Sequence, residues 1–290
     1  MPLYLEYYFW LLLISVGVGV LERVWPRHPG QKVFRAEWDQ DLFWLLFNTH
    51  FVSWMLALAG VQLARWFQAA LPAGGGIPWE SLRLLSDWPW LLQFAVCFVV
   101  KDFIEWNVHR LMHVVPWLWR FHRLHHSIEQ LDWLATFRGH WAELVILKLV
   151  AYLPMVVLGV DDSVVFAIVA VQTLLHELTH ANLPWGWGRL GYVFNSPRLH
   201  AWHHDVALHG RHGQNFSISL SLWDWLFGTA YLPQQPETPA RLGFEGMERY
   251  PRGIWGRLWD PIGSGAGGGG GGKASPQPRV PEAPSGRDGG

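Results

Sequence analysis

Five apolar stretches constrain the fold of this chain more than any other feature of its sequence. A helix of about 20 apolar residues is long enough to cross a bilayer, and inside a bilayer only helices and closed barrels satisfy their own backbone hydrogen bonds. We therefore predict an all-α integral membrane protein with about four to five transmembrane or membrane-embedded helices. The stretches are residues 3–21, 42–67, 88–108, 141–160 and 163–180.

The composition agrees with a membrane protein. Only 16% of the 290 residues are charged, whereas soluble domains carry about 25%. The chain has 21 tryptophans, a residue that gathers at membrane interfaces. A net charge of −1 gives no reason to expect nucleic acid as a partner. Cys97 is the only cysteine, so an intrachain disulfide is impossible, and we expect it to act as a small apolar residue.

Basic residues in the loops indicate the orientation, because loops rich in Lys and Arg stay on the cytoplasmic side. After the first stretch come Arg23, Arg27, Lys32 and Arg35. Counting crossings from there places 109–140 and the chain after residue 180 on the cytoplasmic side, and 69–87 outside. The first stretch has no basic segment before it and no evident cleavage site, so we expect a retained membrane segment. The bacterial inner membrane and the endoplasmic reticulum are the expected locations.

The end of the chain differs from the rest in composition. Residues 1–87 hold the first apolar stretches, residues 88–232 hold most of the histidines, and residues 233–290 are polar and rich in Gly and Pro. Residues 262–290 cannot bury enough apolar surface to fold. We predict that the region 233–290 is a largely disordered tail.

Histidines are concentrated in one part of the chain. Of the 15 histidines, 13 lie between residues 109 and 212, and ten of these form two pairs spaced i, i+4 and two triads spaced i, i+3, i+4. On a helix such neighbours share one face, so each group can direct two or three imidazoles at a metal ion. The groups are His109 and His113; His122, His125 and His126; His176 and His180; and His200, His203 and His204.

The topology predicts that these ten histidines meet in a helical cap at the cytoplasmic surface. The hairpin 141–180 crosses out and back around the turn 159–162, which returns its histidine pair to the side of the others. Ten ligands are too many for one zinc, which takes four, and they divide naturally between two ions. Five ligands each suit iron better, with zinc as a possible substitute. We expect His28, His50, His209 and His212, which lack the spacing, not to be ligands.

The sequence His176-Glu177-Leu178-Thr179-His180 raises an alternative. H-E-x-x-H on a helix is the zinc-protease signature, with the glutamate as general base. An intramembrane zinc metalloprotease would also need a third ligand, commonly Asp in an Asp-Gly context, and the only Asp-Gly, 288–289, lies in the predicted tail. We therefore expect Glu177 to be incidental, facing away from the metal or supporting it indirectly. A metal-binding membrane protein without catalysis is a third possibility.

Residues 95–232 resemble the fatty acid hydroxylase superfamily, the sterol desaturase-like integral-membrane enzymes. The resemblance rests on the segments KDFIEWNVHRLMH, WRFHRLHHS, RGHWAE, HELTHAN, SPRLHAWHH and LWDWLFGT, which occur in the family's order and spacing. The first box is closer to the sterol desaturase and alkylglycerol monooxygenase branches than to fatty acid 2-hydroxylases. One departure is Asn215-Phe216-Ser217, where the family often has Asn-Tyr-Gly.

The resemblance implies a catalytic domain over 88–232 with a non-haem diiron site. Such a site uses O2 as co-substrate to hydroxylate or desaturate an unactivated C–H bond of a lipid that enters from the bilayer. Sterol, hopanoid, carotenoid, fatty acyl and ether lipids all remain possible substrates. The chain has no G-x-G-x-x-G and no cysteine set for an iron–sulfur cluster. A separate electron donor is therefore expected, such as a ferredoxin or a cytochrome b5-type protein with its reductase.

The remaining predictions concern residues around the ligands. Ligating imidazoles usually donate their second N–H to a carboxylate or carbonyl, and seven polar residues lie near the histidines in the sequence. Four arginines between 109 and 140 could form a landing patch for the donor or anchor the chain to lipid headgroups. The polar residues are Asp102, Glu105, His140, Glu143, Asn182, Asp205 and Asn215, and the arginines are Arg110, Arg120, Arg123 and Arg138.

Overall fold

The computed structural model describes residues 3–56, 58–59, 62, 83–233 and 238–263. Throughout these residues the chain is helical and contains no β-strand, which confirms the all-α part of the predicted fold class. The long helices are α1 (Leu3–Val24), α4 (Trp90–Val114), α6 (Trp141–Val157) and α7 (Asp162–His180). The shorter α-helices are α2 (Trp38–Leu46), α5 (Pro116–His122), α8 (Pro197–His203), α9 (Leu222–Phe227) and α10 (Ile254–Gly263).

Single turns of other helix types connect these elements. A π-helical turn, η1, extends α2, and 3-10 turns lie before α6, after α7 and before α10. Their bounds are η1 Phe47–Val52, η3 His125–Ser127, η4 Trp133–Phe137, η5 Gly188–Tyr192 and η6 Met247–Arg249.

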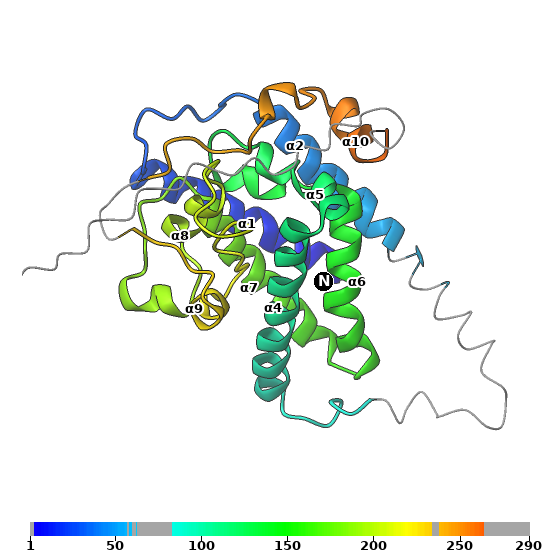
Figure 1. Ribbon diagram of the computed structural model, residues 1–290. Coiled ribbons are helices and arrows are strands. Elements are labelled where there is room, and N and C mark those ends of the chain that lie inside the picture. Colours follow the sequence, from blue (N-terminus) through cyan, green and yellow to red (C-terminus); the bar gives the residue numbers. More distant parts are fainter. Residues whose placement is uncertain (1–2, 57, 60–61, 63–82, 234–237, 264–290) are drawn as a thin grey trace, which may run out of the picture.

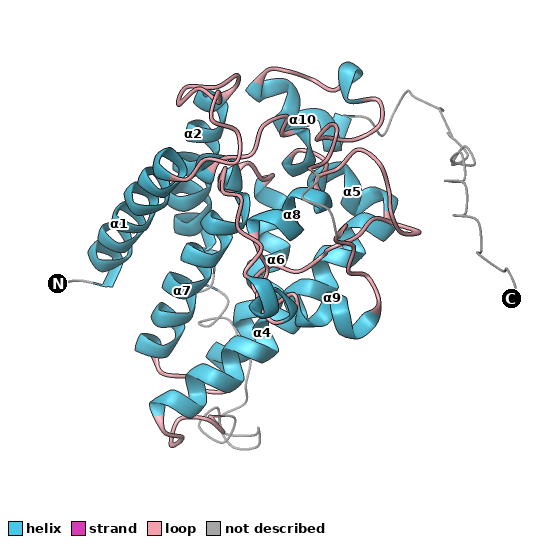
Figure 2. Cartoon of the chain, turned by 90° about the vertical axis from the view of Figure 1, so that its left-hand side faces the viewer, coloured by secondary structure: helices cyan, strands magenta, loops and turns pink. Residues whose placement is uncertain are grey.

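Helices α4, α6 and α7 run side by side, and the short helices gather at one end of them (Figures 1 and 2). A core of apolar side chains from all three helices, including Cys97, Met155 and Ile168, holds them together. Cys97 thus acts as a small apolar residue of the core, as predicted. Helix α1 packs on α7 through a second core around Val18 and Ala181. The end of α7 that carries its histidines therefore lies close to the short helices.

The predicted hairpin between 141 and 180 is present. Helix α6 ends at Val157 and α7 begins at Asp162, where the Asp161 side chain accepts a hydrogen bond from the Ser163 amide. Gly159 has φ +73° in the turn, and a Cβ there would lie 2.7 Å from the Arg83 side chain. Glycine is therefore required at this position.

Fewer helices meet a membrane-spanning criterion than the sequence predicted. Among the described residues two helices are long and apolar enough, Glu6–Val24 and Asp162–His180. Helix α4 includes Lys101, Asp102 and Glu105, and α6 has 17 residues, fewer than a straight crossing needs. Residues 57, 60–61 and 63–67 of the second predicted span lie outside the described residues. The number of spans stays a prediction.

The prediction of a largely disordered tail from residue 233 does not hold for residues 238–263. This segment contains η6 and α10, and it packs on α2. Arg257 is buried and donates hydrogen bonds to Glu37 and Gln40, while the Tyr250 ring joins a core with Trp44. The segment is polar in composition, yet ion pairs and apolar side chains, among them Phe244, Tyr250 and Leu258, fix it to the rest of the protein. Residues 264–290 lie outside the described residues.

Candidate metal centre

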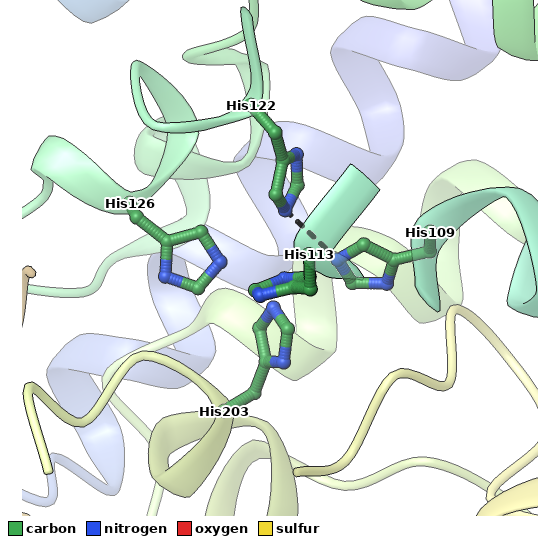
Figure 3. Close-up of side chains that lie close together, drawn as sticks. All are labelled: His109, His113, His122, His126 and His203. Carbon is green, nitrogen blue, oxygen red and sulfur yellow. Dashed lines mark hydrogen bonds between the residues drawn. The ribbon is translucent and has the colours of Figure 1, made fainter. Parts of the chain in front are cut away.

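Nine of the ten predicted histidines come together in the structure as two groups. In each group the possible ligand nitrogens all lie within 4.8 Å of one another. Figure 3 shows the first group, whose imidazoles point toward one another. The five-histidine group is His109, His113, His122, His126 and His203, and the four-histidine group is His125, His180, His200 and His204.

The two groups adjoin. The ring centroids of His126 and His204 lie 4.7 Å apart, and those of His122 and His125 lie 5.4 Å apart. All nine side chains except His113, which is half-buried, are buried. The arrangement is one cluster of imidazoles with two points at which ligand nitrogens converge; each such point is called a focus below.

Local structure explains how the short segments present their histidines. Helix α8 starts with a Ser196 side chain that accepts a hydrogen bond from the Leu199 amide, followed by Pro197 in the first turn, a favoured pair at helix starts. Helix α5 likewise starts at Pro116 and ends at His122. His125 and His126 lie in the 3-10 turn η3, so the first triad is not part of one regular helix.

Each triad is divided between the two groups, which differs from the prediction that its members share one focus. His200 and His204 belong to the four-histidine group and His203 to the other, and His122 and His126 are separated from His125 in the same way. At about 100° per residue, side chains at i and i+4 differ by about 40°, whereas those at i+3 and i+4 differ by about 100°. In the second triad the i+3 member, His203, therefore points in a different direction from His204, and the packing of α8 brings it to the other group. In the first triad, His125 lies in the separate turn η3.

His176 is the predicted ligand that joins neither group. It is half-buried one turn before His180 on α7, and the two ring centroids lie 4.9 Å apart. Its backbone carbonyl accepts hydrogen bonds from Thr136 Oγ1 and His180 Nδ1, at 3.1 and 3.0 Å. The carbonyl of His176 therefore orients the His180 ring, while its own ring stands beside the four-histidine group.

The nitrogen positions fit metal ions. His109 Nε2 lies 3.0 Å from His122 Nε2, and His200 Nε2 lies 3.0 and 3.1 Å from the Nε2 atoms of His180 and His204. Metal–nitrogen bonds of about 2.0–2.1 Å place neighbouring ligand nitrogens about 3 Å apart.

Buried nitrogens without hydrogen-bond partners also favour metal binding at this site. In the described part of the chain, the Nε2 atoms of His113, His126 and His203 are buried and have no hydrogen-bond partner. A buried polar atom without a partner costs free energy, and a metal ion would supply the missing contact. The donor set therefore fits two metal ions.

Burial keeps the imidazoles outside the predicted spans neutral. It lowers the pKa of His122 to about 3. Burial, and to a smaller extent the neighbouring His122, lower the pKa of His125 to about 4. Burial also lowers the pKa of His200, His203 and His204 well below the usual range. Neutral imidazole is the form that binds metal.

Backbone carbonyls and one carboxylate hold the rings in place. In the five-histidine group, the Nδ1 atoms of His109 and His203 lie 2.7 and 2.9 Å from the carbonyls of Phe216 and Gln214. His122 Nδ1 lies 2.8 Å from Glu143 Oε1. In the four-histidine group, His125 Nδ1 lies 3.0 Å from the carbonyl of Arg138.

Of the seven polar residues proposed to support the ligands, Glu143 is the one whose side chain contacts a grouped histidine. Asp102 lies two turns, about 10 Å, before His109 along α4, and its carboxylate accepts from the Ser219 amide, the Leu220 amide and Trp223 Nε1. It fixes the segment before α9 to α4.

Glu105 and His140 have other partners than predicted. Glu105 is buried and pairs with Lys101 Nζ at 2.6 Å, and Gln172 also donates to it. His140 Nδ1 accepts from the Ala142 amide at the start of α6, and its Nε2 lies 3.0 Å from the Leu258 carbonyl. His140 caps α6 and connects it to α10.

The three remaining residues also serve the loops. Asn182 exchanges hydrogen bonds with the backbone of His28, at 3.0 and 3.2 Å. Asp205 lies 2.8 Å from Nε2 of His209. Asn215, with φ +55°, donates to the Leu199 and Tyr231 carbonyls. Within the described part of the chain, none of these three side chains makes a hydrogen bond to a grouped histidine; their partners are backbone groups and His209.

Sequence reasoning missed the function of the loop 214–217, which supplies carbonyls to two histidines. Asp224 holds this loop, because its carboxylate accepts from the Phe216 and Ser217 amides at 3.0 and 2.8 Å and from Trp106 Nε1 at 3.0 Å. The motif LWDWLFGT contains Asp224 and was the available signal. The unusual Phe216 contributes its carbonyl, a contact that does not depend on the side chain.

Glu177 does not face the histidines. Its carboxylate is buried between α7 and α1 and accepts a hydrogen bond from Ser15 Oγ at 2.8 Å. A general base must lie near the metal-bound water. The structure therefore does not favour the metalloprotease reading.

The four arginines do not form one patch. Arg138 is 1% exposed and binds Glu37 and Asp41, and Arg123 pairs with Asp260. Arg110 is exposed. The predicted landing patch is therefore wrong for Arg138, whose charge is neutralised inside the protein.

Comparison with known proteins agrees with this geometry. A protein-family model described as fatty acid hydroxylase matches residues 94–229. An ornithine lipid hydroxylase of Rhizobium tropici is 32% identical over 63% of this chain and 57% of its own length. A cholesterol 25-hydroxylase-like protein of Danio rerio is 32% identical over 53% of this chain and 62% of its own length. An alkylglycerol monooxygenase of Caenorhabditis elegans is 26% identical over 56% of this chain and 32% of its own length.

The chain thus spans about three fifths or less of the length of these three relatives. No solved structure matches it significantly.

Proposed function

Because the chain belongs to the fatty acid hydroxylase superfamily through residues 94–229, we propose that it is a membrane-bound diiron oxidoreductase. It uses O2 and external electrons to hydroxylate or desaturate a C–H bond of a lipid. The observation that carries this proposal is the pair of adjoining histidine groups, buried and neutral, with ligand nitrogens directed at two foci. Two iron ions, which zinc can replace, would be held by these groups and would supply O2 activation.

The residues of this chain have three tasks in such a reaction. The imidazoles hold the ions, and the carbonyls of Gln214, Phe216 and Arg138 and the carboxylate of Glu143 fix the rings. Burial excludes bulk water from the foci. Rigid supports of this kind keep a reacting group within a small fraction of an ångström of its productive position.

The balance of the reaction requires a reductant. Hydroxylation consumes one C–H group, one O2, two electrons and two protons and gives C–OH and one water. Desaturation consumes two C–H groups, one O2, two electrons and two protons and gives C=C and two waters. Since the chain has one cysteine and no dinucleotide-binding motif, a separate one-electron carrier, a ferredoxin or a cytochrome b5-type protein with its reductase, delivers the electrons.

The substrate is a lipid that enters from the membrane. Support comes from relatives whose names specify an ornithine lipid, a sterol and an alkylglycerol, and from the two long apolar helices. The basic residues after α1 support a position of the histidine groups on the cytoplasmic side of a bacterial inner membrane or of the endoplasmic reticulum.

The proposal is tested by metal analysis and by lipid analysis. Purified protein is expected to hold two ions per chain, and lipid extracts of expressing cells are expected to contain an oxidised lipid only when O2 is supplied. A chain that binds one zinc and cleaves peptides would contradict the proposal. Unchanged lipids with two bound ions in the presence of a competent donor would support metal binding without catalysis instead.

A further inference from the structure

A polar cavity of about 640 Å³ lies next to the histidine groups and is not used by the proposed chemistry. Three segments far apart in sequence line it: the loop after α1, the turn after η3, and the segment from Thr238 to Arg257. In Figure 1 the loop after α1, in blue, runs beside the orange segment. Ser127 and Ala201, each next to a grouped histidine in sequence, belong to the inner wall.

The cavity has an excess of unpaired positive charge. Arg257 and Glu37 in its wall neutralise each other at 2.8 Å. Within the described residues, no ion pair exists for Arg27, Arg241 or Arg252, and Glu129 is the unpaired acidic residue in the wall. Three free guanidinium groups thus face one free carboxylate.

Arg27 shows that a ligand is missing. Its Nη2 atom is buried and has no hydrogen-bond partner. Burial, and then the like charge of Arg198, lower the pKa of Arg27 to about 10, so the guanidinium remains charged at neutral pH without a counterion. Arg27 is half-buried as a residue, but a buried donor atom without a partner costs free energy, and a guanidinium binds carboxylate or phosphate in a bidentate manner.

The position of the cavity identifies the source of that anion. Helix α1 exposes an apolar stripe that includes Val16, Val20 and Val24, and Trp25 follows it at the surface. A stripe of this kind faces lipid, and tryptophan sits at headgroup level. Arg27 lies only two residues further along the chain. Basic pockets at the cytoplasmic ends of membrane helices bind anionic headgroups.

We propose that this cavity binds the anionic headgroup, phosphate or carboxylate, of the lipid substrate. The inference rests on the proposed function and makes it more specific. Arg27, Arg241 and Arg252 hold the headgroup at one side of Ser127 and Ala201, with the two histidine groups on the other side. The headgroup contact therefore selects lipids that carry negative charge.

The test is equilibrium binding of lipids to the purified, metal-loaded full chain in neutral detergent. The probes are phosphatidylglycerol and an N-acylglycine, which are anionic, and phosphatidylcholine, which is zwitterionic. We expect at least one anionic lipid to bind about ten-fold more tightly than phosphatidylcholine, since one charge-assisted hydrogen bond contributes about 1.5–3 kcal/mol. Equal affinity for all three lipids would overturn the proposal.

Substitutions of single arginines test which residues cause the preference for the anionic lipid. Arg27→Gln and Arg241→Gln are each expected to remove most of the preference for the anionic lipid. Arg189→Gln, which removes one exposed charge in η5 away from the cavity, is the matched control and should leave the preference unchanged. Loss of the preference in the control alone, or in none of the three variants, would contradict the assignment.

Two further measurements separate the possible outcomes. Inorganic phosphate at millimolar concentration should not displace the anionic lipid from the wild-type protein. Complete displacement would make a soluble phosphate compound the ligand and overturn the lipid assignment. Metal content, measured on each sample, should stay at the wild-type value in Arg27→Gln. A failure of the proposed diiron function would appear as missing metal, whereas a failure of the headgroup site would appear with full metal.

Discussion

The two histidine groups are similar in composition but differ in what supports them. In the five-histidine group, His122 is bound to the Glu143 carboxylate, and two other rings bind carbonyls of the loop 214–217. The four-histidine group has neutral supports, and the Nδ1 atoms of His200 and His204 are buried without a partner in the described residues. One focus therefore has a carboxyl group behind it, and the other does not.

This difference teaches that two similar sets of ligands need not bind metal equally. A carboxylate behind an imidazole raises its basicity and fixes its orientation, so we expect the five-histidine group to hold its ion more tightly. The four-histidine group depends on backbone carbonyls and on the packing around it. The following predictions test this difference, and the last one tests a residue that is expected to affect neither group.

Replacing one ligand in each group should have the largest effect. In His203→Ala and His125→Ala, a buried donor of one group is removed, so we expect each variant to lose about one of the two ions, the one at its own focus. Inductively coupled plasma mass spectrometry of the purified protein measures this loss. His212→Ala, which removes an exposed histidine outside both groups, is the control. Full occupancy in both ligand variants would contradict the site.

Replacing Glu143 with Gln tests the support specific to the five-histidine group. The amide keeps the shape of the side chain but removes the charge behind His122. We expect about a 10–100-fold loss of metal affinity at that focus, with the other focus nearly unchanged. Competition with a chromophoric chelator gives both affinities. Equal weakening of the two sites would show that the carboxylate does not distinguish them.

Replacing Asp224 with Asn acts on the same group from a greater distance. The carboxylate holds the loop 214–217 through the Phe216 and Ser217 amides, and an amide retains only part of this acceptor capacity. We expect a loss of about 1.5–3 kcal/mol in stability and only a few-fold loss of metal affinity. Thermal unfolding in detergent with and without metal checks it. An unchanged melting temperature would refute the role given to Asp224.

Replacing Glu177 with Gln should have the smallest effect. The side chain faces Ser15 and neither focus, so both ions and the oxidation of lipid should be retained. Metal content and lipid analysis of the variant provide the measurement. If both ions were lost, the zinc-protease interpretation of H-E-x-x-H would have to be reconsidered.

The sequence predicted which histidines come together, for nine of the ten, because helical spacing is a local property. His109 and His113 on α4 illustrate this, since a regular helix keeps both in the same group. The division of the triads depends on how α8 and η3 are rotated against their neighbours, so spacing alone could not reveal which ring serves which focus.

The groups that hold the imidazole rings were harder to predict because they come from distant segments. Asp102 and Asp205 lie near histidines in sequence, but Asp102 on α4 binds the amide of Ser219 and Asp205 contacts His209. The carbonyls of Gln214 and Phe216 carry no signal in their side chains, since every residue has a carbonyl. The ordered segment 238–263 was missed because its apolar residues, among them Phe244 and Leu258, are scattered in a polar sequence and pack against a core formed with distant Trp44.

Arg138 connects the histidine groups to the segments that flank residues 94–229. Its carbonyl binds His125, while its guanidinium is clamped by Glu37 and Asp41, and Glu37 also binds Arg257 of α10. A fragment limited to residues 94–229 would leave this guanidinium without its acidic partners, at a cost of about 3–5 kcal/mol for a buried charge. The boundaries of the homologous region are therefore not the boundaries of a stable unit, and we expect a shortened version of this protein to need both flanking segments.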